Sequence, residues 1–287
     1  MPSHLKERVH ARMEKTGESY QQALRKVRES EDRPSAERAA RSRTVADTAF
    51  SIAEVRAAEG ARPDKMFDDP YAAMFAAAGG HAAESTQRFL ELPFFFDGVR
   101  LRTRYIDDAV RAGIAAGLGQ VVLLGAGFDA RGLRMPEIAD VPVYEIDTAE
   151  QLARKRKVLA ENGVKLPRNV VHVPFDFDDA DLREALAAKG FVPGVGAMFV
   201  WEGVIGYIDA AEIDRSLRFM AHEGGPKSRV AFTFGLYSFD HETCAECTRR
   251  AGFGTFEELG GDELWRRYLP GEPPPTAFVM RIATATV

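Results

Sequence analysis

The chain has 287 residues, 45% of them hydrophobic, and a formal net charge of −5. That length and composition exclude a disordered chain and can bury a sizeable core, so we expect one domain or a domain with an appendage. The negative charge argues against a general nucleic-acid-binding surface, and the lack of an apolar run of about 18 residues or of a signal-peptide core predicts a soluble, cytoplasmic protein with neither nucleic acid nor membrane as partner.

Residues 1–41 predict a helical N-terminal extension. Apolar residues recur at helical spacing on both sides of the polar stretch 16–19, which indicates two short amphipathic helices. Acidic residues are interleaved with the basic ones throughout, so the charge pattern does not favour nucleic-acid binding. The extension could be a dimer arm, a substrate lid or a loosely attached tail, and a homodimer formed through these helices is one expectation.

Residues 42–116 predict a helical lid region. A helix is expected over 42–55, with Ser42 or Thr44 as its N-cap. A shorter helix is expected over 69–78, where a proline suits the first turn. A third helix should run over 105–116, immediately before the first strand.

The stretch VVLLGAGFDAR, residues 121–131, organises the predicted core over 117–287. Residues 121–124 predict a fully buried strand, because they are apolar without polar alternation. Gly125 and Gly127 let the backbone turn tightly, and Gly125 leaves no side chain between the strand end and a ligand. The next apolar run, 141–146, ends at Asp147, 20 residues beyond Gly127. A nucleoside-binding α/β sheet places a carboxylate there to accept two ribose hydroxyls.

The nature of the ligand is less clear from the glycine pattern. Residues 125–130, GAGFDA, also fit the relaxed dinucleotide pattern GxGxxG/A, so a nicotinamide oxidoreductase and a plain glycine-rich turn are alternatives. Asp129, however, brings a negative charge to the helix start where a pyrophosphate would lie. About 120 residues also precede the strand, whereas a dinucleotide domain usually begins close to its first strand. Both features favour a cationic sulfonium ligand, S-adenosyl-L-methionine.

Strands and helices then alternate to the end of the chain. After Asp147 we expect a helix over 149–161, with the charge run 154–157 on its solvated side. The remaining expected elements are strands over 170–175, 197–201, 230–234 and 277–284, and helices over 210–222, 242–251 and 256–268. This alternation, without repeats or low-complexity linkers, predicts a doubly wound α/β sheet.

Cys244 and Cys247 form one CxxC motif, with His241 three residues before it. No second ligand pair is present for zinc, and a redox motif should open a helix that follows a strand. We therefore expect two ordinary helix residues in a reducing compartment, and no metal site.

Seven segments resemble the leucine carboxyl methyltransferase family in sequence, order and spacing. They are SRTVADTAFSIAEVRAAE (42–59), FDDPYA (67–72), RTRYIDDAV (102–110), LLGAGFDARGLR (123–134), YEIDTAE (144–150), VPFDFDD (173–179) and FVWEGVIGYI (199–208). The resemblance covers residues 42–239. It implies a Rossmann-like class I methyltransferase sheet with an antiparallel last strand, a helical cover over the site, and S-adenosyl-L-methionine as the cofactor.

The resemblance also implies site residues. Arg102, with Arg104 as the fallback, would pair with the methionine carboxylate, a bidentate match that suits arginine. Asp176 and Phe177 would hold the adenine. This chain has Phe177 where the family has leucine, and Asp176 could instead cap the next helix. Glu202, at the carboxyl end of the fourth strand, would face the ammonium or sulfonium region of the cofactor.

Methyl transfer from a sulfonium releases a neutral leaving group, so it needs alignment of the reactants and no metal. A carboxylate acceptor is ionised at pH 7 and needs no base. His172, His222 and His241 are better explained as structural, so no catalytic residue is assigned. We therefore predict O-methylation of a carboxylate on a small metabolite or polyketide-like natural product, with Tyr207 or Trp201 lining the acceptor side. O-methylation of a phenolic or alcoholic hydroxyl and a non-catalytic S-adenosyl-L-methionine-binding protein are the alternatives.

Overall fold

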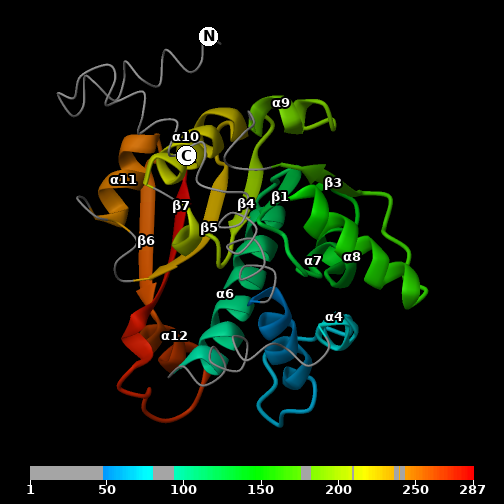
Figure 1. The fold of residues 1–287 in the computed structure, drawn as a ribbon. Coiled ribbons are helices and arrows are strands. Elements are labelled where there is room, and N and C mark those ends of the chain that lie inside the picture. Colours follow the sequence, from blue (N-terminus) through cyan, green and yellow to red (C-terminus); the bar gives the residue numbers. More distant parts are fainter. Residues whose placement is uncertain (1–47, 80–93, 176–181, 209, 236–238, 240–242) are drawn as a thin grey trace, which may run out of the picture. The chain divides into compact units, whose positions relative to one another are not determined.

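Seven strands form one sheet at the centre of the structure (Figure 1). The computed structural model describes residues 48–79, 94–175, 182–208, 210–235, 239 and 243–287, all within one compact unit, Asp47–Val287. The strands are β1 (Gln120–Leu124), β2 (Val143–Asp147), β3 (Val170–Pro174), β4 (Ala197–Trp201), β5 (Arg229–Gly235), β6 (Thr255–Gly260) and β7 (Met280–Thr286). The helices expected within 1–41 lie outside the described residues.

The strand order is β3-β2-β1-β4-β5-β7-β6. The first five strands of the chain pair in parallel, whereas β7 is antiparallel to both β5 and β6. This arrangement confirms the predicted Rossmann-like class I methyltransferase sheet, including its antiparallel last strand.

Helices cover both faces of the sheet. Those on the two faces are α6 (Phe95–Ala115), α8 (Ala149–Glu161), the six-residue α9 (Leu182–Ala187), α10 (Ala210–Gly224), α11 (Cys244–Ala251) and α12 (Gly261–Tyr268). Short elements are α4 (Ala72–Ala78), α7 (Arg131–Arg134), η1 (Pro136–Ile138), η2 (Ile205–Tyr207) and η3 (Ala277–Val279). None of the helices in the described part of the chain has the length and apolar character needed to span a membrane.

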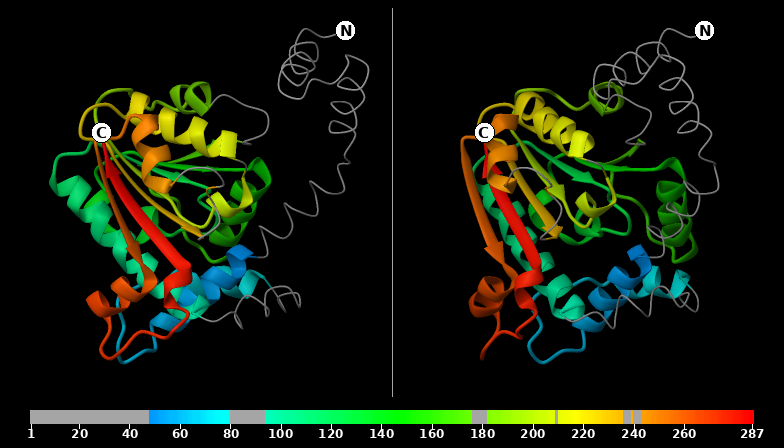
Figure 2. Two further views of the ribbon diagram at one scale, coloured as in Figure 1. Left: turned by 90° about the vertical axis from the view of Figure 1, so that its left-hand side faces the viewer. Right: turned by 60° about the vertical axis from the view of Figure 1, so that its left-hand side comes forward.

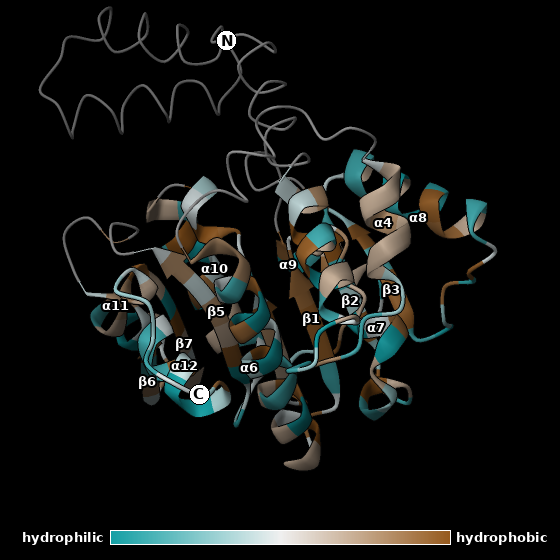
Figure 3. Ribbon diagram, turned by 90° about the horizontal axis from the view of Figure 1, so that it is seen from below, coloured by the Kyte–Doolittle hydropathy of each residue, from teal (hydrophilic) through white to brown (hydrophobic). Residues whose placement is uncertain are grey.

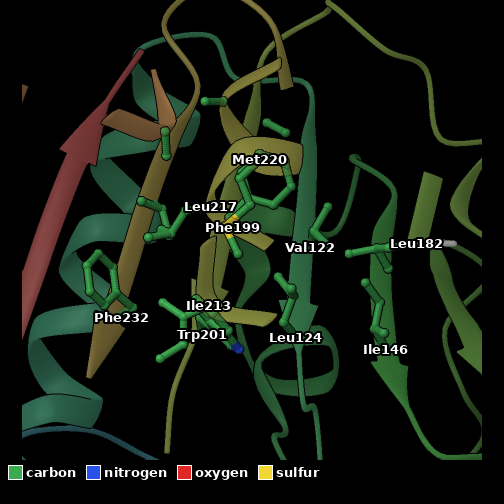
Figure 4. Packing of buried hydrophobic residues seen from close by; sticks show 14 of the residues in the cluster. Val122, Leu124, Ile146, Leu182, Phe199, Trp201, Ile213, Leu217, Met220 and Phe232 are labelled. Atoms are coloured by element: carbon green, nitrogen blue, oxygen red, sulfur yellow. The ribbon is translucent and has the colours of Figure 1, made fainter. Parts of the chain in front are cut away.

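Alternate residues of the central strands pack on opposite faces. Val122 and Leu124 of β1 lie in an apolar cluster with residues of α9, α10 and α11, which Figure 4 shows from close by. Val121 and Leu123 lie in a second cluster with residues of α6 and α12, and Figure 2 shows α6 and α10 on opposite faces of the sheet. Because both faces are covered, residues 121–124 of β1 are all apolar, and β1 is accordingly mostly brown in Figure 3.

A helical cover packs against the turn that follows β1. It consists of a helix whose described part is 48–59 and of α4. A third apolar cluster joins Ala53 and Phe75 of the cover to Phe128 of the turn and Val158 of α8, with the rings of Phe75 and Phe128 stacked 4.8 Å apart. By contrast, α6 packs in the same apolar cluster as residues of β1 and β4.

Two expectations for the C-terminal part are wrong. The helix expected over 256–268 begins only at Gly261, because Thr255–Gly260 forms β6 and pairs with β7 along its whole length. Cross-strand pairing there outweighs the weak local preference of the segment TFEELG. The last strand begins at Met280 rather than at 277, since Ala277–Val279 forms η3.

The helix α8 has the expected bounds, and Thr148 caps it by accepting a hydrogen bond from the backbone N–H of Gln151. The expectation that its whole charge run is solvated is wrong at one position. Lys155 is fully buried, because its ammonium pairs with the buried carboxylate of Glu145 on β2, 2.6 Å away.

Candidate functional site

The carboxyl ends of β1, β2 and β4 meet at one edge of the sheet, because these strands are neighbours and parallel. Open α/β sheets bind their ligands at this edge. Gly125 and Gly127 follow β1, Asp147 ends β2, and Glu202 follows β4. The sheet thus brings these four predicted residues to one place.

The turn after β1 depends on its two glycines. Gly125 has φ +66° and Gly127 has φ +49°, in the left-handed region where residues with a Cβ are strained. A Cβ on Gly125 would also lie 2.3 Å from Cγ2 of Val204, whereas one on Gly127 would have nothing nearer than 3.8 Å. The missing side chain at Gly125 therefore lets the segment after β4 approach the end of β1.

The carboxylate of Asp147 is oriented by two backbone amides. Its Oδ2 accepts the N–H of Gly127 at 2.7 Å, and its Oδ1 accepts the N–H of Thr148 at 2.7 Å. Burial raises the pKa of Asp147, although these two hydrogen bonds oppose the rise. Since each carboxylate oxygen has two lone pairs, each can still accept one hydroxyl of a ligand.

Three arginines from three different elements hold Glu202. Its Oε1 accepts from Nη2 of Arg56 and from Nε of Arg102, both at 2.9 Å, and its Oε2 accepts from Nη1 of Arg131 at 2.9 Å. Burial would raise the pKa of Glu202, but the three guanidinium groups lower it far below the usual range. Glu202 is therefore ionised near neutral pH, and it ties the cover helix, α6 and α7 to the end of β4.

Arg131 is at the centre of this ion-pair network. It is fully buried and also binds Asp129 and Asp107, the latter with Nε to Oδ1 at 2.8 Å. Asp107 in turn accepts two hydrogen bonds from Arg134, at 2.7 and 2.8 Å. Four charged side chains from α6, the turn and α7 thus neutralise one another beneath the sheet edge.

The structure removes one of the two sequence-based reasons for expecting S-adenosyl-L-methionine rather than a dinucleotide, namely the charge of Asp129. Asp129 is only 8% exposed, and although burial would raise its pKa, Arg131 and Arg56 lower it. Its charge is therefore neutralised within the protein, by Arg131 and Arg56 and by a hydrogen bond from the first backbone N–H of α7. Repulsion of a pyrophosphate by Asp129 no longer favours one cofactor over another.

Arg102 and Arg104 point to different surroundings. Arg102 contributes only its Nε to Glu202, and its two Nη atoms make no further hydrogen bond within the described part of the chain. Arg104 instead binds Asp108 and the carbonyl oxygen of Met66. Of the two candidates, only Arg102 lies beside Glu202 at the sheet edge.

The residues predicted to line the acceptor side or to hold the adenine lie in different surroundings. The hydroxyl of Tyr207 in η2 lies 3.3 Å from Oγ1 of Thr48 on the cover helix, so Tyr207 is at the site. Trp201 is fully buried in the apolar cluster of β4 (Figure 4) and offers no exposed surface to an acceptor. Asp176 and Phe177 lie outside the described residues, just beyond the end of β3.

The cover helix is fixed at two points. Near the site, Nε of Arg56 donates to Oγ1 of Thr103 on α6 at 3.3 Å. One turn later, Glu59 and Arg100 of α6 form a fully buried ion pair, with Oε2 and Nε 2.5 Å apart. These contacts keep the helix over the sheet edge, where it can exclude water from the site.

Sequence reasoning missed Arg56 and Arg131. Both lie inside segments that resemble the family, but no local pattern links them to Glu202, which is 146 and 71 residues away respectively. The only signal was an arginine directly after the glycine-rich turn. No group of three metal-binding side chains occurs among the described residues, and Cys244 and Cys247 are buried in α11 without a disulfide bond.

The chain is similar to several known proteins. The family model described as "Leucine carboxyl methyltransferase" matches residues 49–221. A protein of Parafrankia sp. (strain EAN1pec), named "Putative S-adenosyl-L-methionine-dependent methyltransferase", is 35% identical over 238 residues, covering 80% of this chain and 74% of its own. A Streptomyces avermitilis protein of the same description is 33% identical over 242 residues, covering 79% and 78%. A solved structure of magnesium protoporphyrin IX methyltransferase from Synechocystis aligns at 15% identity and a TM-score of 0.44, covering 68% of this chain and 85% of that one.

Proposed function

Because the chain belongs to the leucine carboxyl methyltransferase family, we propose that it transfers a methyl group from S-adenosyl-L-methionine to a carboxylate oxygen of a small-molecule acceptor. The acceptor class we propose is a small metabolite or polyketide-like natural product. Both curated relatives carry the name of an S-adenosyl-L-methionine-dependent methyltransferase, which supports the cofactor and the reaction class.

The residues at the sheet edge fit this cofactor. The observation that carries the proposal is Asp147, whose two oxygens are oriented by amides and can each still accept a ribose hydroxyl. The Nη atoms of Arg102, which make no hydrogen bond to the described residues, form a fork that matches a carboxylate. The methionine part of the cofactor has such a carboxylate. Gly125 leaves the end of β1 without a side chain.

When bound, the cofactor supplies an electrophilic methyl group on a sulfonium that leaves as a neutral thioether. The residues of this chain then have to hold the two reactants in line and keep water out. Positioning of this kind can lower the activation barrier by roughly 7–11 kcal/mol. The ion-pair network of Glu202 and its three arginines does this by fixing the cover helix, α6 and the end of β4 relative to one another.

A carboxylate acceptor is supported by the electrostatics of the site. A hydroxyl acceptor would need a base, but Arg131 and the other arginines lower the pKa of both Asp129 and Glu202 against the effect of burial, so neither accepts a proton well near neutral pH. His172 is engaged by Arg156, 3.1 Å from its Nδ1. Neither carboxylate of this arginine network is therefore suited to deprotonate a hydroxyl, whereas a carboxylate acceptor is already ionised.

The test is to incubate the protein with S-adenosyl-L-methionine labelled in its methyl group and with a culture extract, and then to isolate the labelled product. We expect label that mild alkali releases as methanol, because it cleaves a methyl ester but not an ether. Asp147→Ala should abolish labelling, whereas the matched control Asp140→Ala, at an exposed position, should leave it unchanged. Alkali-stable label would indicate a hydroxyl acceptor, and cofactor binding without labelling across a broad acid and phenol panel would indicate a non-catalytic binding protein.

A further inference from the structure

A buried ion pair lies directly behind the glycine-rich turn. Lys155 of α8 and Glu145 of β2 are both fully buried, with Nζ and Oε2 2.6 Å apart. Nζ of Lys155 also donates a hydrogen bond to the carbonyl oxygen of Asp129, 2.5 Å away. Lys155 thus connects three elements, namely α8, β2 and the turn after β1.

The stability of the folded protein does not by itself explain why an ion pair, rather than an apolar pair, occupies these two positions. Removing two charges from water costs several kcal/mol per ion, and an apolar pair of similar volume is often equally stable or more stable. An apolar residue at 155 could fill the same space, but it could not donate to the backbone of Asp129. The hydrogen bond to that carbonyl oxygen is therefore a contribution of Lys155 that packing could not replace.

Asp129 is the residue through which the turn is held in place. Its N–H donates to the carbonyl oxygen of Ala126 at 2.7 Å, which closes the turn, and its carboxylate accepts the backbone N–H of Arg131 at 2.7 Å. The same turn presents the N–H of Gly127 to Asp147. A shift of the Asp129 backbone would therefore move both the amide that orients Asp147 and the arginine that holds Glu202.

The charge of Lys155 also acts on Asp147 directly. It is one of the groups that oppose the rise in the pKa of Asp147 caused by burial, whereas Glu145 adds to that rise. Backbone position and electrostatics thus both connect Lys155 to the residue proposed to bind the ribose.

We propose that Lys155 is a positioning residue for the cofactor, which holds the turn at 125–129 in its binding conformation through the hydrogen bond to the carbonyl oxygen of Asp129. This inference rests on the proposed function, since it assigns the turn to S-adenosyl-L-methionine. Lys155 itself touches neither the cofactor nor the acceptor. In this role Glu145 neutralises the lysine, and Lys155 provides the specific contact.

The experiment uses the full chain and S-adenosylhomocysteine as the probe, with affinity measured by calorimetry and stability by urea unfolding. Lys155→Met should weaken binding about tenfold or more, since small misplacements of binding groups have effects of this size or larger, and it should also destabilise the protein because Glu145 stays charged. In the double variant Glu145→Met with Lys155→Met, we expect the unfolding midpoint to recover while binding remains about tenfold weaker than in the wild type. The matched control is Lys157→Met, whose side chain is 73% exposed.

A second measurement separates positioning from packing without any ligand. Amide hydrogen exchange at Gly127 and Arg131 should speed up in the double variant although its global stability is restored, because local opening of the turn becomes easier. Wild-type binding and wild-type exchange in the double variant would overturn the proposal, and would leave the proposed function intact. Failure of the wild-type protein to bind S-adenosylhomocysteine would instead refute the proposed function.

Glu145→Gln provides the test if the methionine variants do not fold. It keeps a neutral acceptor next to Lys155 and leaves the hydrogen bond to Asp129 in place, so binding should stay within about threefold of the wild type, a change of less than 1 kcal/mol. A tenfold loss in this variant would show that affinity follows the charge of the pair rather than the contact with the turn, and would contradict the inference.

Discussion

Gly125 combines a backbone requirement with a steric one, and the two can be measured separately. Replacing it with alanine forces a Cβ onto a residue with φ +66°, which costs about 1–2 kcal/mol. The new Cβ would also lie 2.3 Å from Cγ2 of Val204, and relieving such an overlap in a packed site costs about 1–3 kcal/mol. Gly125→Ala should therefore lower the free energy of unfolding by about 2–5 kcal/mol.

Gly127→Ala is the matched control, because it introduces the same backbone strain without a steric overlap. Its φ is +49°, but the nearest atom to a new Cβ is Cβ of Ala49 at 3.8 Å, an ordinary contact. We expect a loss of about 1–2 kcal/mol. The difference between the two alanine variants then reports the contact with Val204.

Val204→Ala in the Gly125→Ala background should recover the steric part. Removing Cγ2 eliminates the overlapping atom, so a double-mutant cycle should give a favourable coupling of about 1–3 kcal/mol. Urea unfolding followed by the fluorescence of the two tryptophans gives all four free energies. Equal losses for the two glycine variants, or additivity between positions 125 and 204, would refute the reasoning.

Three further predictions concern the charged and thiol groups. Glu202→Gln should lower the free energy of unfolding by about 3–5 kcal/mol, because the buried Arg56 and Arg131 and the partly buried Arg102 would lose their shared carboxylate. The half-buried Glu258→Gln should lower it by less than about 1 kcal/mol, and comparable urea midpoints would contradict this. The arginines hold the pKa of Glu202 in the folded protein below its ordinary value of 4.5. The stabilisation that Glu202 provides is therefore present above pH 4.5 and is lost as the pH falls toward the folded pKa. The glutamine variant should accordingly lose less stability in acid than the wild type. Burial raises the pKa of Asp147 above its ordinary value of 3.8. As the pH is lowered, calorimetry should therefore show the affinity for S-adenosylhomocysteine falling before the pH reaches 3.8. A constant affinity down to that pH would argue against Asp147 as the residue that binds the ribose. Burial also raises the pKa of the Cys244 thiol, so Cys244 and Cys247 should react with an aromatic disulfide reagent only in urea, and rapid reaction of the folded protein would show that α11 opens.

The sequence alone determined the parallel core of the sheet and the edge at which ligands bind. The runs ending at Leu124 and Trp201 are apolar on both faces, and a strand covered on both sides explains that composition. Gly125, Gly127 and Asp147 could be predicted as site residues because their roles depend on backbone freedom and on position at a strand end. Both properties are local, so the chain records them within a few residues.

Only the tertiary structure decided which charged side chains are buried and with which partners. Lys155 lies in a run of four basic residues, and nothing in that run distinguishes the one that meets Glu145 across the α8–β2 contact. Arg56, 146 residues before Glu202, joins it only because the cover helix folds over the sheet edge, and β6 exists only because β7 provides a partner. A buried charge or an edge strand is stable only with a specific partner elsewhere in the chain, and local sequence patterns do not encode that pairing.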